Sequence, residues 1–372
     1  MKIRSIFKWF VRLIFVAILL GGLLFFIAYW RSSNDCESKA AVPTTPMKAI
    51  VYCDYGLPNV KVQEIEKPTP TDDQLLIKVR AVSVNPYDWH FVEGTPKIMR
   101  LGVGLRKPKE TRLGIDYAGI VEAVGKNVTR FKAGDEVFGG RNGAFAEYVC
   151  VREDRLAALK PANLTFEQAA SVDIAGVTAL QALRDRGNVQ PGQKVLINGA
   201  SGGVGTFAVQ IAKVFGAEVT GVCSTRNVDL VRSIGADHVI DYTKEDFTKS
   251  EQRYDVMLDN VANRSLSKCR RTLMPKGKYI MIGGGGANEQ GWFGVMARPL
   301  KALILSKFVG QKMGMMLTDA KQSDLIALAD LMQSGKVTPV IGRTYKSLSE
   351  VPEALRYLEQ GHARGKVVIT ID

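Results

Sequence analysis

Residues 196–227, LINGASGGVGTFAVQIAKVFGAEVTGVCSTRN, combine a short apolar run, a glycine-rich turn and a periodic apolar face. The run 194–198 predicts a short buried strand, and the glycines that follow it permit a tight turn. Apolar residues then recur at helical spacing, which gives the helix one face for packing on a sheet. This order of strand, turn and helix is typical of a dinucleotide-binding unit, where backbone amides approach a pyrophosphate at the positive end of the helix.

The second strand of this unit ends at VCSTRN, where a carboxylate normally accepts the ribose hydroxyls of NAD. Ser224, Thr225 and Arg226 stand there instead. Hydroxyl donors beside a guanidinium can hold a 2′-phosphate, so we predict NADP(H) as the cofactor. Two alternatives are that Arg226 is only a solvated charge and that Asp229, in the next helical turn, is the ribose acid. The contacts expected at the glycine-rich turn are Ser201, Gly202, Gly203, Val204 and Gly205.

The rest of the body predicts an α/β protein with two domains. Residues 47–165 carry alternating apolar segments punctuated by Gly, Pro and Asp, which is typical of an antiparallel β-rich domain. Residues 166–315 alternate strands with helices, which predicts a doubly wound parallel Rossmann sheet. The tail, 316–372, returns to strand, helix, strand and is expected to rejoin the first domain. The predicted parallel strands are 194–198, 217–223, 238–241, 254–259 and 278–283.

The segment 1–46 has the pattern of a membrane anchor and tether. Four positive charges precede an uncharged apolar run, 13–30. This run closes with Tyr29 and Trp30 and is followed by Arg31. Its length fits the roughly 17 to 25 residues that cross a bilayer as a helix. A cleavable signal is the alternative, but such signals usually have a shorter core that ends in small residues. We predict one uncleaved N-terminal transmembrane helix, with the lipid bilayer as a partner.

The side of the membrane is left open by the sequence. The positive-inside rule places the N-terminus in the cytoplasm and the body outside. A reduced nicotinamide cofactor instead favours a cytoplasmic body, and we prefer that placement.

The charge and cysteine content exclude several classes of protein. The net charge of +13 is spread along the chain without the motif of an RNA-recognition module, a zinc finger or a basic zipper, so no nucleic-acid partner is expected. Anionic lipid or a phosphate-bearing cofactor accounts for the excess. The five cysteines are widely separated and form no CxxC pair, so neither a disulfide framework nor a structural zinc site is predicted. They are Cys36, Cys53, Cys150, Cys223 and Cys269.

Six motifs occur along the chain in this order: SVNPYDW, LGIDYAGIVEAVG, FKAGDEVFGG, GAFAEYV, VQPGQKVLINGASGGVGTFAVQIAK and GADHVIDY. In this combination the chain resembles the medium-chain dehydrogenase/reductase superfamily, in its zinc-independent quinone oxidoreductase-like branch. The resemblance covers 47–372. It implies a GroES-like catalytic domain, a Rossmann domain, a cofactor site between them and a possible homodimer.

The zinc ligands of the related alcohol dehydrogenases are missing. Asn85 stands where those enzymes have a cysteine, and Ile115 where they have a histidine. Neither side chain is a good zinc ligand, and the three histidines are scattered, so no metal is predicted. Without a Lewis acid, reduction of an electron-poor quinone or α,β-unsaturated carbonyl is easier than oxidation of an alcohol.

The resemblance also implies roles for individual residues. Asn85 is expected to make a polar contact near the nicotinamide or the substrate carbonyl, and Asp88 either acts in catalysis or fixes its loop. Thr178 matches a position beside the nicotinamide, and Tyr242 one near the adenosine phosphate. Further cofactor contacts are Asn260, Gly283 and Lys366, the last of which is alternatively a strand-edge charge. No proton donor is identified.

One segment, 292–318, departs from the compact family pattern because it is apolar and rich in methionine, with interspersed lysines. It is either core or dimer contact, or a lid or membrane-apposed access path for a hydrophobic substrate. Two functions compete with the quinone or enone reductase. One is an NAD(P)-dependent alcohol or aldehyde dehydrogenase, and the other is an NADPH-binding, membrane-tethered redox sensor or scaffold without turnover.

Overall fold

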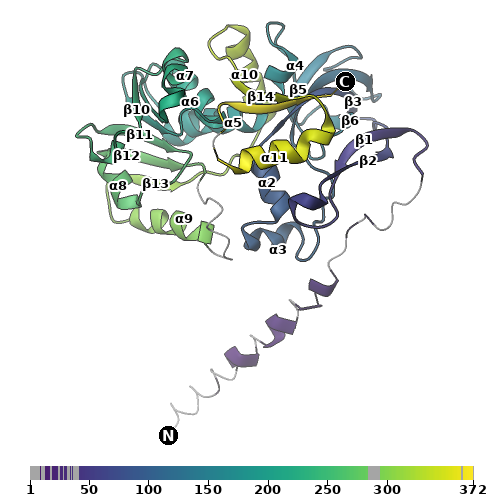
Figure 1. Ribbon diagram of the computed structural model, residues 1–372, viewed down its shortest axis with the longest axis horizontal. Helices are drawn as coiled ribbons and strands as arrows, with labels where there is room; N and C mark the ends of the chain where they lie inside the picture. The colour runs from purple at the N-terminus through teal and green to yellow at the C-terminus, as the bar shows by residue number, and fades with distance from the viewer. Residues whose placement is uncertain are drawn as a thin grey trace.

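The structure is a computed structural model. It describes residues 9, 13–16, 19–23, 26–27, 29–31, 34, 36, 42–283, 294–361 and 363–371. The described body contains two large sheets with helices packed around them (Figure 1). The resemblance correctly predicted this combination of a GroES-like β domain and a Rossmann domain.

The β domain is built on a seven-stranded sheet in the order β14-β15-β3-β4-β5-β7, with β6 also paired to β3. Its long strand β3 is buried at nearly every position because it has neighbours on both sides and helices over it. The two C-terminal strands cross over to this sheet, and β15 pairs antiparallel with β3 (Figure 1). The strands are β3 (Gln74–Val84), β4 (Asp116–Val124), β5 (Glu136–Gly140), β6 (Tyr148–Arg152), β7 (Ala157–Leu159), β14 (Ile341–Tyr345) and β15 (Lys366–Thr370). A separate two-stranded sheet pairs β1 (Pro46–Val51) with β2 (Lys61–Glu66).

The Rossmann domain is a six-stranded, all-parallel sheet in the order β10-β9-β8-β11-β12-β13. Its central strands are continuous apolar runs because helices cover both faces of a parallel sheet. The five predicted strands are confirmed, and the sequence missed the sixth, β13. The strands are β8 (Lys194–Asn198), β9 (Glu218–Cys223), β10 (His238–Asp241), β11 (Tyr254–Asp259), β12 (Leu273–Met281) and β13 (Lys312–Met315).

The helices connect these strands and bury their apolar faces against the sheets. A pair in the middle of the chain, α5 and α6, packs together, and α10 packs on α5. The α-helices are α2 (Pro86–Glu93), α3 (Arg100–Val103), α4 (Phe166–Ala169), α5 (Asp173–Gln181), α6 (Gly203–Val214), α7 (Val228–Ser233), α8 (Leu266–Arg271), α9 (Gly294–Leu305), α10 (Gln322–Gln333) and α11 (Val351–Glu359). A π-helical turn, η3 (Ala182–Gly187), continues α5. The 3₁₀ turns are η1 (Leu57–Asn59), η2 (Lys97–Met99), η4 (Thr225–Asn227), η5 (Phe247–Lys249) and η6 (Leu348–Glu350).

The N-terminal prediction needs correction. Among the residues that the structure describes, no helix combines the length and the apolar character needed to cross a membrane. Within 13–30 the described residues 13–16, 19–23, 26–27 and 29–30 are helical, and 17–18, 24–25 and 28 lie outside the described residues. The predicted transmembrane anchor is therefore not supported, and the predicted membrane localisation is wrong.

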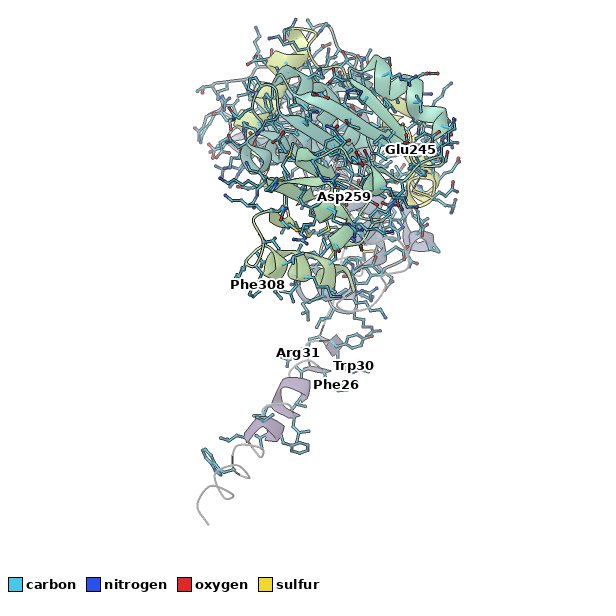
Figure 2. The ribbon with its side chains drawn as sticks, turned by 90° about the vertical axis from the view of Figure 1, so that its left-hand side faces the viewer. Phe26, Trp30, Arg31, Glu245, Asp259 and Phe308 are labelled. Atoms are coloured by element: carbon cyan, nitrogen blue, oxygen red, sulfur yellow. A yellow bond between two sulfur atoms is a disulfide. The ribbon has the colours of Figure 1, made fainter. Side chains whose placement is uncertain are left out.

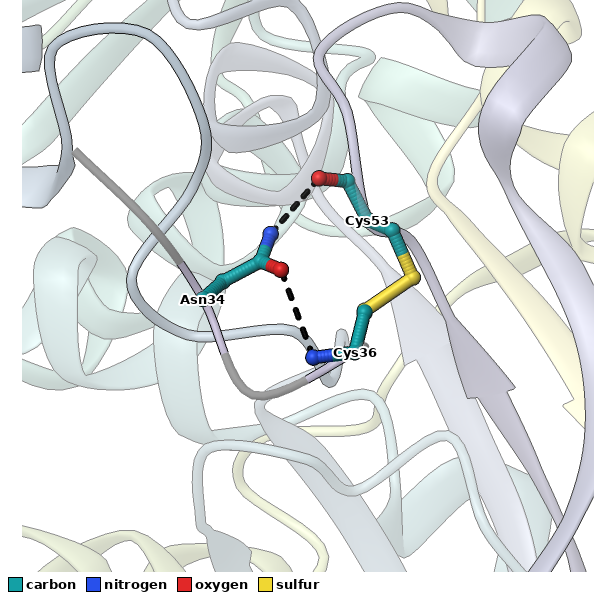
Figure 3. Close-up of a disulfide and its surroundings, with 3 residues drawn as sticks. All are labelled: Asn34, Cys36 and Cys53. Carbon is teal, nitrogen blue, oxygen red and sulfur yellow. Dashed lines mark hydrogen bonds between the residues drawn. A yellow bond between two sulfur atoms is a disulfide. The ribbon is translucent and has the colours of Figure 1, made fainter. Parts of the chain in front are cut away.

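A disulfide joins Cys36 to Cys53, with 5.8 Å between their Cα atoms (Figure 3). Asn34 supports it, because its Nδ2 donates to the Cys53 carbonyl at 2.6 Å and its Oδ1 accepts from the Cys36 amide at 3.3 Å. The expectation of no disulfide is thus wrong. The two cysteines approach each other only because the chain turns back onto the loop after β1, a contact that sequence spacing cannot show. Cys223 and Cys269 are buried thiols, and burial raises the pKa of each to about 11.

The segment 292–318 is partly core. Its strand β13 completes the Rossmann sheet, and Ala302, Met313 and Met316 are buried. Phe308 is 81% exposed and lies at the rim of the body (Figure 2). The membrane-apposed interpretation fails together with the membrane localisation. The start of the segment, 292–293, is outside the described residues.

Candidate active site

The glycine-rich turn between β8 and α6 has the shape that the sequence predicts. Gly199 adopts a φ of +82°, which only glycine accepts without strain. A Cβ on Gly205 would lie 2.1 Å from the Gly199 carbonyl oxygen, so the helix packs directly on the turn. Gly202 precedes the first turn of α6 and provides no side-chain cap. The amides at this end of α6 are therefore available to an anion.

The loops that follow β8, β9 and β11 meet beside this turn. Asn227 donates to the Ser201 and Ser224 hydroxyls at 3.0 and 3.3 Å, which brings these two predicted contacts together. The amide of Asn260 lies against the turn after β8, and its Nδ2 donates to the Asn198 carbonyl at 3.2 Å. The Oδ1 atoms of Asn227 and Asn260 are buried without a hydrogen-bond partner. Two unsatisfied acceptors beside a glycine-rich turn fit a dinucleotide, whose hydroxyl and amide groups can donate to them.

A carboxylate does stand near the end of β9, although β9 itself does not supply it. Thr225 donates to Oδ2 of Asp241, the last residue of β10, at 2.6 Å, and Thr243 donates to Oδ1 at 2.7 Å. The Thr225 hydroxyl is the main cause that lowers the pKa of Asp241 to about 2. The sequence of β9 does not reveal this acid, because Asp241 belongs to β10, which pairs with β9 and brings the carboxylate alongside its end.

The other predicted contacts at this end are exposed or line the loops. Arg226 is exposed on η4, and Tyr242 is 41% exposed directly after β10. A Cβ on Gly283 would lie 2.7 Å from the Asn260 carbonyl oxygen, so the loops after β11 and β12 pack closely at this point. Val204 and Gly203 are half-buried in the first turn of α6.

A buried polar cluster from the β domain lies against the same turn. Lys366, the first residue of β15, donates to Asn85 Oδ1 and to Asp116 Oδ2, the latter at 3.2 Å. Asp116 Oδ2 also accepts from the Ser83 hydroxyl at 2.6 Å, and its Oδ1 accepts from the Ile174 amide at 3.1 Å. The Lys366 and Asp116 side chains are 3% and 0% exposed, so their opposite charges compensate each other without water.

Lys366 connects this cluster to the dinucleotide turn. The Gly365 amide donates to the Ser201 carbonyl at 2.8 Å, and Gly365 forms a parallel bridge with Gly202. A Cβ on Gly203 would lie 3.0 Å from the Lys366 Cδ. The Lys366 side chain therefore lies between the two domains. It is buried, so it is not a solvent-exposed charge at the edge of a strand.

The Asn85 side chain is hydrogen-bonded within this cluster. Its Nδ2 donates to Asp116 Oδ2 at 3.0 Å and to the Ser83 carbonyl at 3.3 Å, which uses both hydrogens of the amide. Its Oδ1 accepts from Lys366. In this geometry Asn85 orients the lysine and has no hydrogen left for a substrate carbonyl.

Asp88 lies beside Asn85 and is 1% exposed. Its Oδ2 accepts from the backbone amide of Asn85 at 2.8 Å, which fixes the start of α2. Burial raises the pKa of Asp88 to about 7. A further acid, Asp173, is also buried, and burial together with the charge of Asp116 raises the pKa of its carboxyl well above the usual range.

Thr178 lies apart from this cluster. It is buried on α5, and its hydroxyl shares a hydrogen bond of 2.8 Å with that of Thr318. The structure thus places it on the Rossmann side of the junction, where it fixes the chain after β13.

An aromatic hollow opens next to Asp88. Tyr87 and Phe91 stack on α2 with ring centroids 4.4 Å apart. The hollow is lined by Tyr52, Tyr87, Asp88, Phe91, Glu110, Arg112, Leu113, Gly114, Ile115 and Asn142. Its accessible space is about 20 Å³, room for about one water molecule, so in this structure its aromatic walls can border a planar substrate but do not enclose one.

The donor set does not resemble a metal centre. Among the described residues, no three His, Cys, Asp or Glu side chains are gathered as ligands would be. Ile115, at the position of a zinc-binding histidine, lines the hollow with an aliphatic side chain.

Sequence reasoning missed the acids that organise this region: Asp116, Asp173, Asp241 and Asp259. Three of them begin or end a strand, within or next to apolar residues. An acid inside a buried apolar run was the available signal, since such a group must be paired or protonated.

Two family models match the chain. The model described as an alcohol dehydrogenase GroES-like domain matches residues 71–161, and the one described as a zinc-binding dehydrogenase matches residues 234–369.

Individual relatives extend the similarity to most of the chain. The 2-methylene-furan-3-one reductase of Solanum lycopersicum is 36% identical over 355 residues, which cover 91% of this chain and 82% of that protein. The chloroplastic NADPH-dependent alkenal/one oxidoreductase of Arabidopsis thaliana is 35% identical, covering 91% of this chain and 85% of that protein. The solved structure of the quinone oxidoreductase from Coxiella burnetii superposes with a TM-score of 0.76 at 29% identity, covering 88% of this chain and 100% of that one.

Proposed function

Because the chain belongs to the medium-chain dehydrogenase/reductase superfamily, in its quinone oxidoreductase-like branch, we propose that it is an NADPH-dependent reductase of quinones or α,β-unsaturated carbonyl compounds. One observation carries the proposal. The residue at the zinc-ligand position, Asn85, is committed to Lys366 and Asp116 beside the dinucleotide turn. The names of the relatives support the substrate class and the cofactor.

Three groups of residues would hold the cofactor. The amides of the turn 199–205 would face the pyrophosphate, with the Lys366 side chain beside them. Ser224 and Arg226 would hold the 2′-phosphate, and Tyr242 stands next to them. The Thr225 hydroxyl does not donate to it, because its hydrogen goes to Asp241. Thr178, Asn260 and Gly283 are assigned to the nicotinamide half. When bound, the cofactor supplies the hydride that reduces the substrate.

The chain's own residues supply alignment and a proton. The aromatic rings of the hollow beside Asp88 would border a planar substrate. Asp88 lines this hollow, and with a pKa of about 7 its carboxyl still carries a proton in part of the molecules at neutral pH. We assign Asp88 as the general acid that protonates the reduced substrate, because it lines the hollow and the backbone amide of Asn85 holds its Oδ2 in place.

Two finer features belong to the same proposal. The reaction proceeds without zinc, since Asn85 and Ile115 stand at two ligand positions and the Asn85 Oδ1 already accepts from Lys366. The enzyme is a homodimer, which light scattering of the purified protein tests directly. Elemental analysis tests the first feature, and stoichiometric zinc that is required for turnover would contradict it.

Cofactor consumption with three substrates tests the function. We expect NADPH to be oxidised faster than NADH with a quinone and with an enone, and neither to be oxidised with a saturated aldehyde. Turnover of the aldehyde alone would instead indicate an alcohol or aldehyde dehydrogenase. Tight NADPH binding without oxidation on any substrate would indicate a sensor or scaffold.

A further inference from the structure

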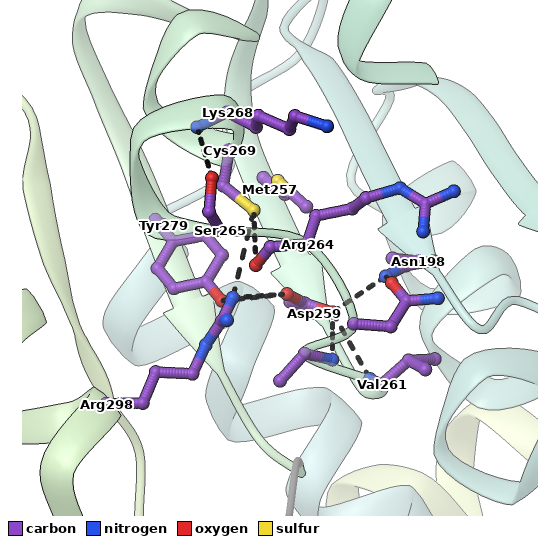
Figure 4. A network of polar contacts seen from close by, with 12 residues as sticks. Asn198, Met257, Asp259, Val261, Arg264, Ser265, Lys268, Cys269, Tyr279 and Arg298 are labelled. Atoms are coloured by element: carbon purple, nitrogen blue, oxygen red, sulfur yellow. Dashed lines mark hydrogen bonds and ion pairs between the residues drawn. The ribbon is translucent and has the colours of Figure 1, made fainter. Parts of the chain in front are cut away.

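A second buried carboxylate organises the cofactor edge of the Rossmann sheet. Asp259 is the last residue of β11 and is fully buried. Its Oδ1 accepts from Asn198 Nδ2 at 2.8 Å and from the Val261 and Ala262 amides at 3.2 and 2.8 Å (Figure 4). One carboxylate oxygen thus connects the ends of two neighbouring strands.

The loop that this oxygen holds is strained. Ala262 has a φ of +57°, which an alanine rarely adopts and which costs on the order of 1 kcal/mol. The hydrogen bond from its amide to Asp259 holds that conformation. The loop begins with Asn260, whose Oδ1 is the buried acceptor without a partner.

The other oxygen of Asp259 is held from the far side by α9. Tyr279 on β12 donates to Oδ2 at 2.7 Å, and Arg298 on α9 donates to the Tyr279 hydroxyl at 2.8 Å. The Arg298 guanidinium also lies 3.6 Å from Oδ2 and compensates its charge. Figure 4 shows this chain of contacts from Arg298 through Tyr279 to Asp259.

We propose that Asp259, held by Tyr279 and Arg298, is a positioning residue that presents Asn260 Oδ1 to a hydroxyl or amide donor of the coenzyme. The proposal rests on the coenzyme site of the proposed function and assigns three residues that act on it from outside. Both strand ends meet at this carboxylate, so a change in it moves the glycine-rich turn and the Asn260 loop together. NADPH and NADH differ only at the 2′ position, where one carries a phosphate and the other a hydroxyl, so the effect is the same for both.

Two matched tyrosines on neighbouring strands separate positioning from simple stability. Tyr279→Phe keeps the ring and removes the hydroxyl that holds Asp259. Tyr254→Phe is the control, because Tyr254 is equally buried in the same apolar cluster but begins β11, at the opposite end of that strand from Asp259. Both variants are expected to lower the thermal midpoint.

Of the two tyrosine variants, only Tyr279→Phe is expected to weaken coenzyme binding. Its Kd should be about tenfold higher for NADPH and for NADH, as for a lost hydrogen bond. Asn260→Ala, on a half-buried loop, is expected to do the same. Calorimetric titration far below the thermal midpoint measures each Kd without a substrate. Steady-state kinetics should show a raised KM for the coenzyme with little change in kcat.

The outcomes are distinct. An unchanged Kd in either Tyr279→Phe or Asn260→Ala, or an equal loss in Tyr254→Phe, would overturn the proposal. If Tyr279→Phe does not fold, Asn260→Ala decides. A wild-type protein that binds neither coenzyme contradicts the proposed function itself, whereas tight wild-type binding with unchanged variants contradicts only the positioning role.

Discussion

Asp88 shows at the scale of one residue how burial and function are linked. The pKa of its carboxyl is about 7 in the folded chain against an ordinary value of 3.8. The folded state therefore binds more protons than the unfolded state between these values, and the stability falls as the pH rises from about 4 to about 7. A shift of this size corresponds to at most about 4 kcal/mol.

Asp88→Asn is accordingly expected to remove much of this pH dependence, since the amide cannot ionise and its oxygen can still accept from Asn85. Denaturant unfolding at pH 4 and pH 8 checks it. The wild type should lose more stability than the variant between these two pH values, although Asp173 contributes to the slope in both. The variant should also lose turnover. Equal losses of stability in the wild type and the variant would show that burial does not raise the pKa of Asp88.

Arg226 is the residue that we assign to the 2′-phosphate. Arg226→Ala should raise the Kd for NADPH about tenfold or more and leave that for NADH unchanged, because only NADPH carries the extra charge. Fluorescence titration with both coenzymes measures the ratio. A parallel loss for both would place Arg226 on the pyrophosphate, and no loss would make it a solvated charge.

The residue types of the site were largely available from the sequence, but their roles were not. Asn85, Ser201 and Lys366 were named from pattern and resemblance, and the structure places all three at the junction of the domains. Asn85 was expected near the nicotinamide or the substrate carbonyl, because sequence shows no hydrogen bonds. Only the packed cluster reveals that both of its amide hydrogens are already used.

At the scale of one element, the turn into α6 leaves no room for an added carbon atom at Gly205. Gly205→Ala would place a methyl group 2.1 Å from the Gly199 carbonyl oxygen, and the backbone must move to relieve the clash. We expect a loss of about 1 to 3 kcal/mol in stability and of most coenzyme affinity. Thermal unfolding with and without NADPH measures both effects.

Gly102→Ala is the control, at a glycine on α3 that is outside the coenzyme site. No atom lies within 4 Å of the added Cβ, so an alanine fits. The coenzyme should still raise the thermal midpoint of this variant. Similar behaviour of the two variants would contradict the role given to close packing at Gly205.

At the scale of the whole molecule, the disulfide fixes the N-terminal segment to the body. Trp30 also contacts Arg106, whose guanidinium lies 5.6 Å from the ring centroid. In Cys36→Ser we expect faster tryptic cleavage after Arg31, because the covalent tie to Cys53 is lost. Peptide mapping under non-reducing conditions measures the tie and the cleavage.

Cys150→Ser is the control, since Cys150 is a half-buried free thiol in β6. It should be cleaved as slowly as the wild type. Reduction with a dithiol should reproduce the Cys36→Ser pattern in the wild type and change nothing in Cys36→Ser. An absence of the 36–53 peptide pair from the non-reduced map would contradict the disulfide.

The sequence by itself determined the two kinds of domain and the location of the dinucleotide turn. Apolar periodicity and glycine spacing are local properties, and they survive in any tertiary context that buries them. Five strands of the Rossmann sheet followed from that information alone. The domain boundaries at 46, 165 and 315 are not fixed by it and remain our proposal.

Tertiary structure decided everything that depends on neighbours distant in sequence. It joined Cys36 to Cys53, brought Asp241 to Thr225, added β13 to the sheet and carried Lys366 across to Asn85. Burial in these contacts, rather than residue type, sets which acids keep their protons and which amide hydrogens remain free. The physical reason is that hydrogen bonds and desolvation act over a few ångströms in space, and only the folded chain determines which residues lie that close.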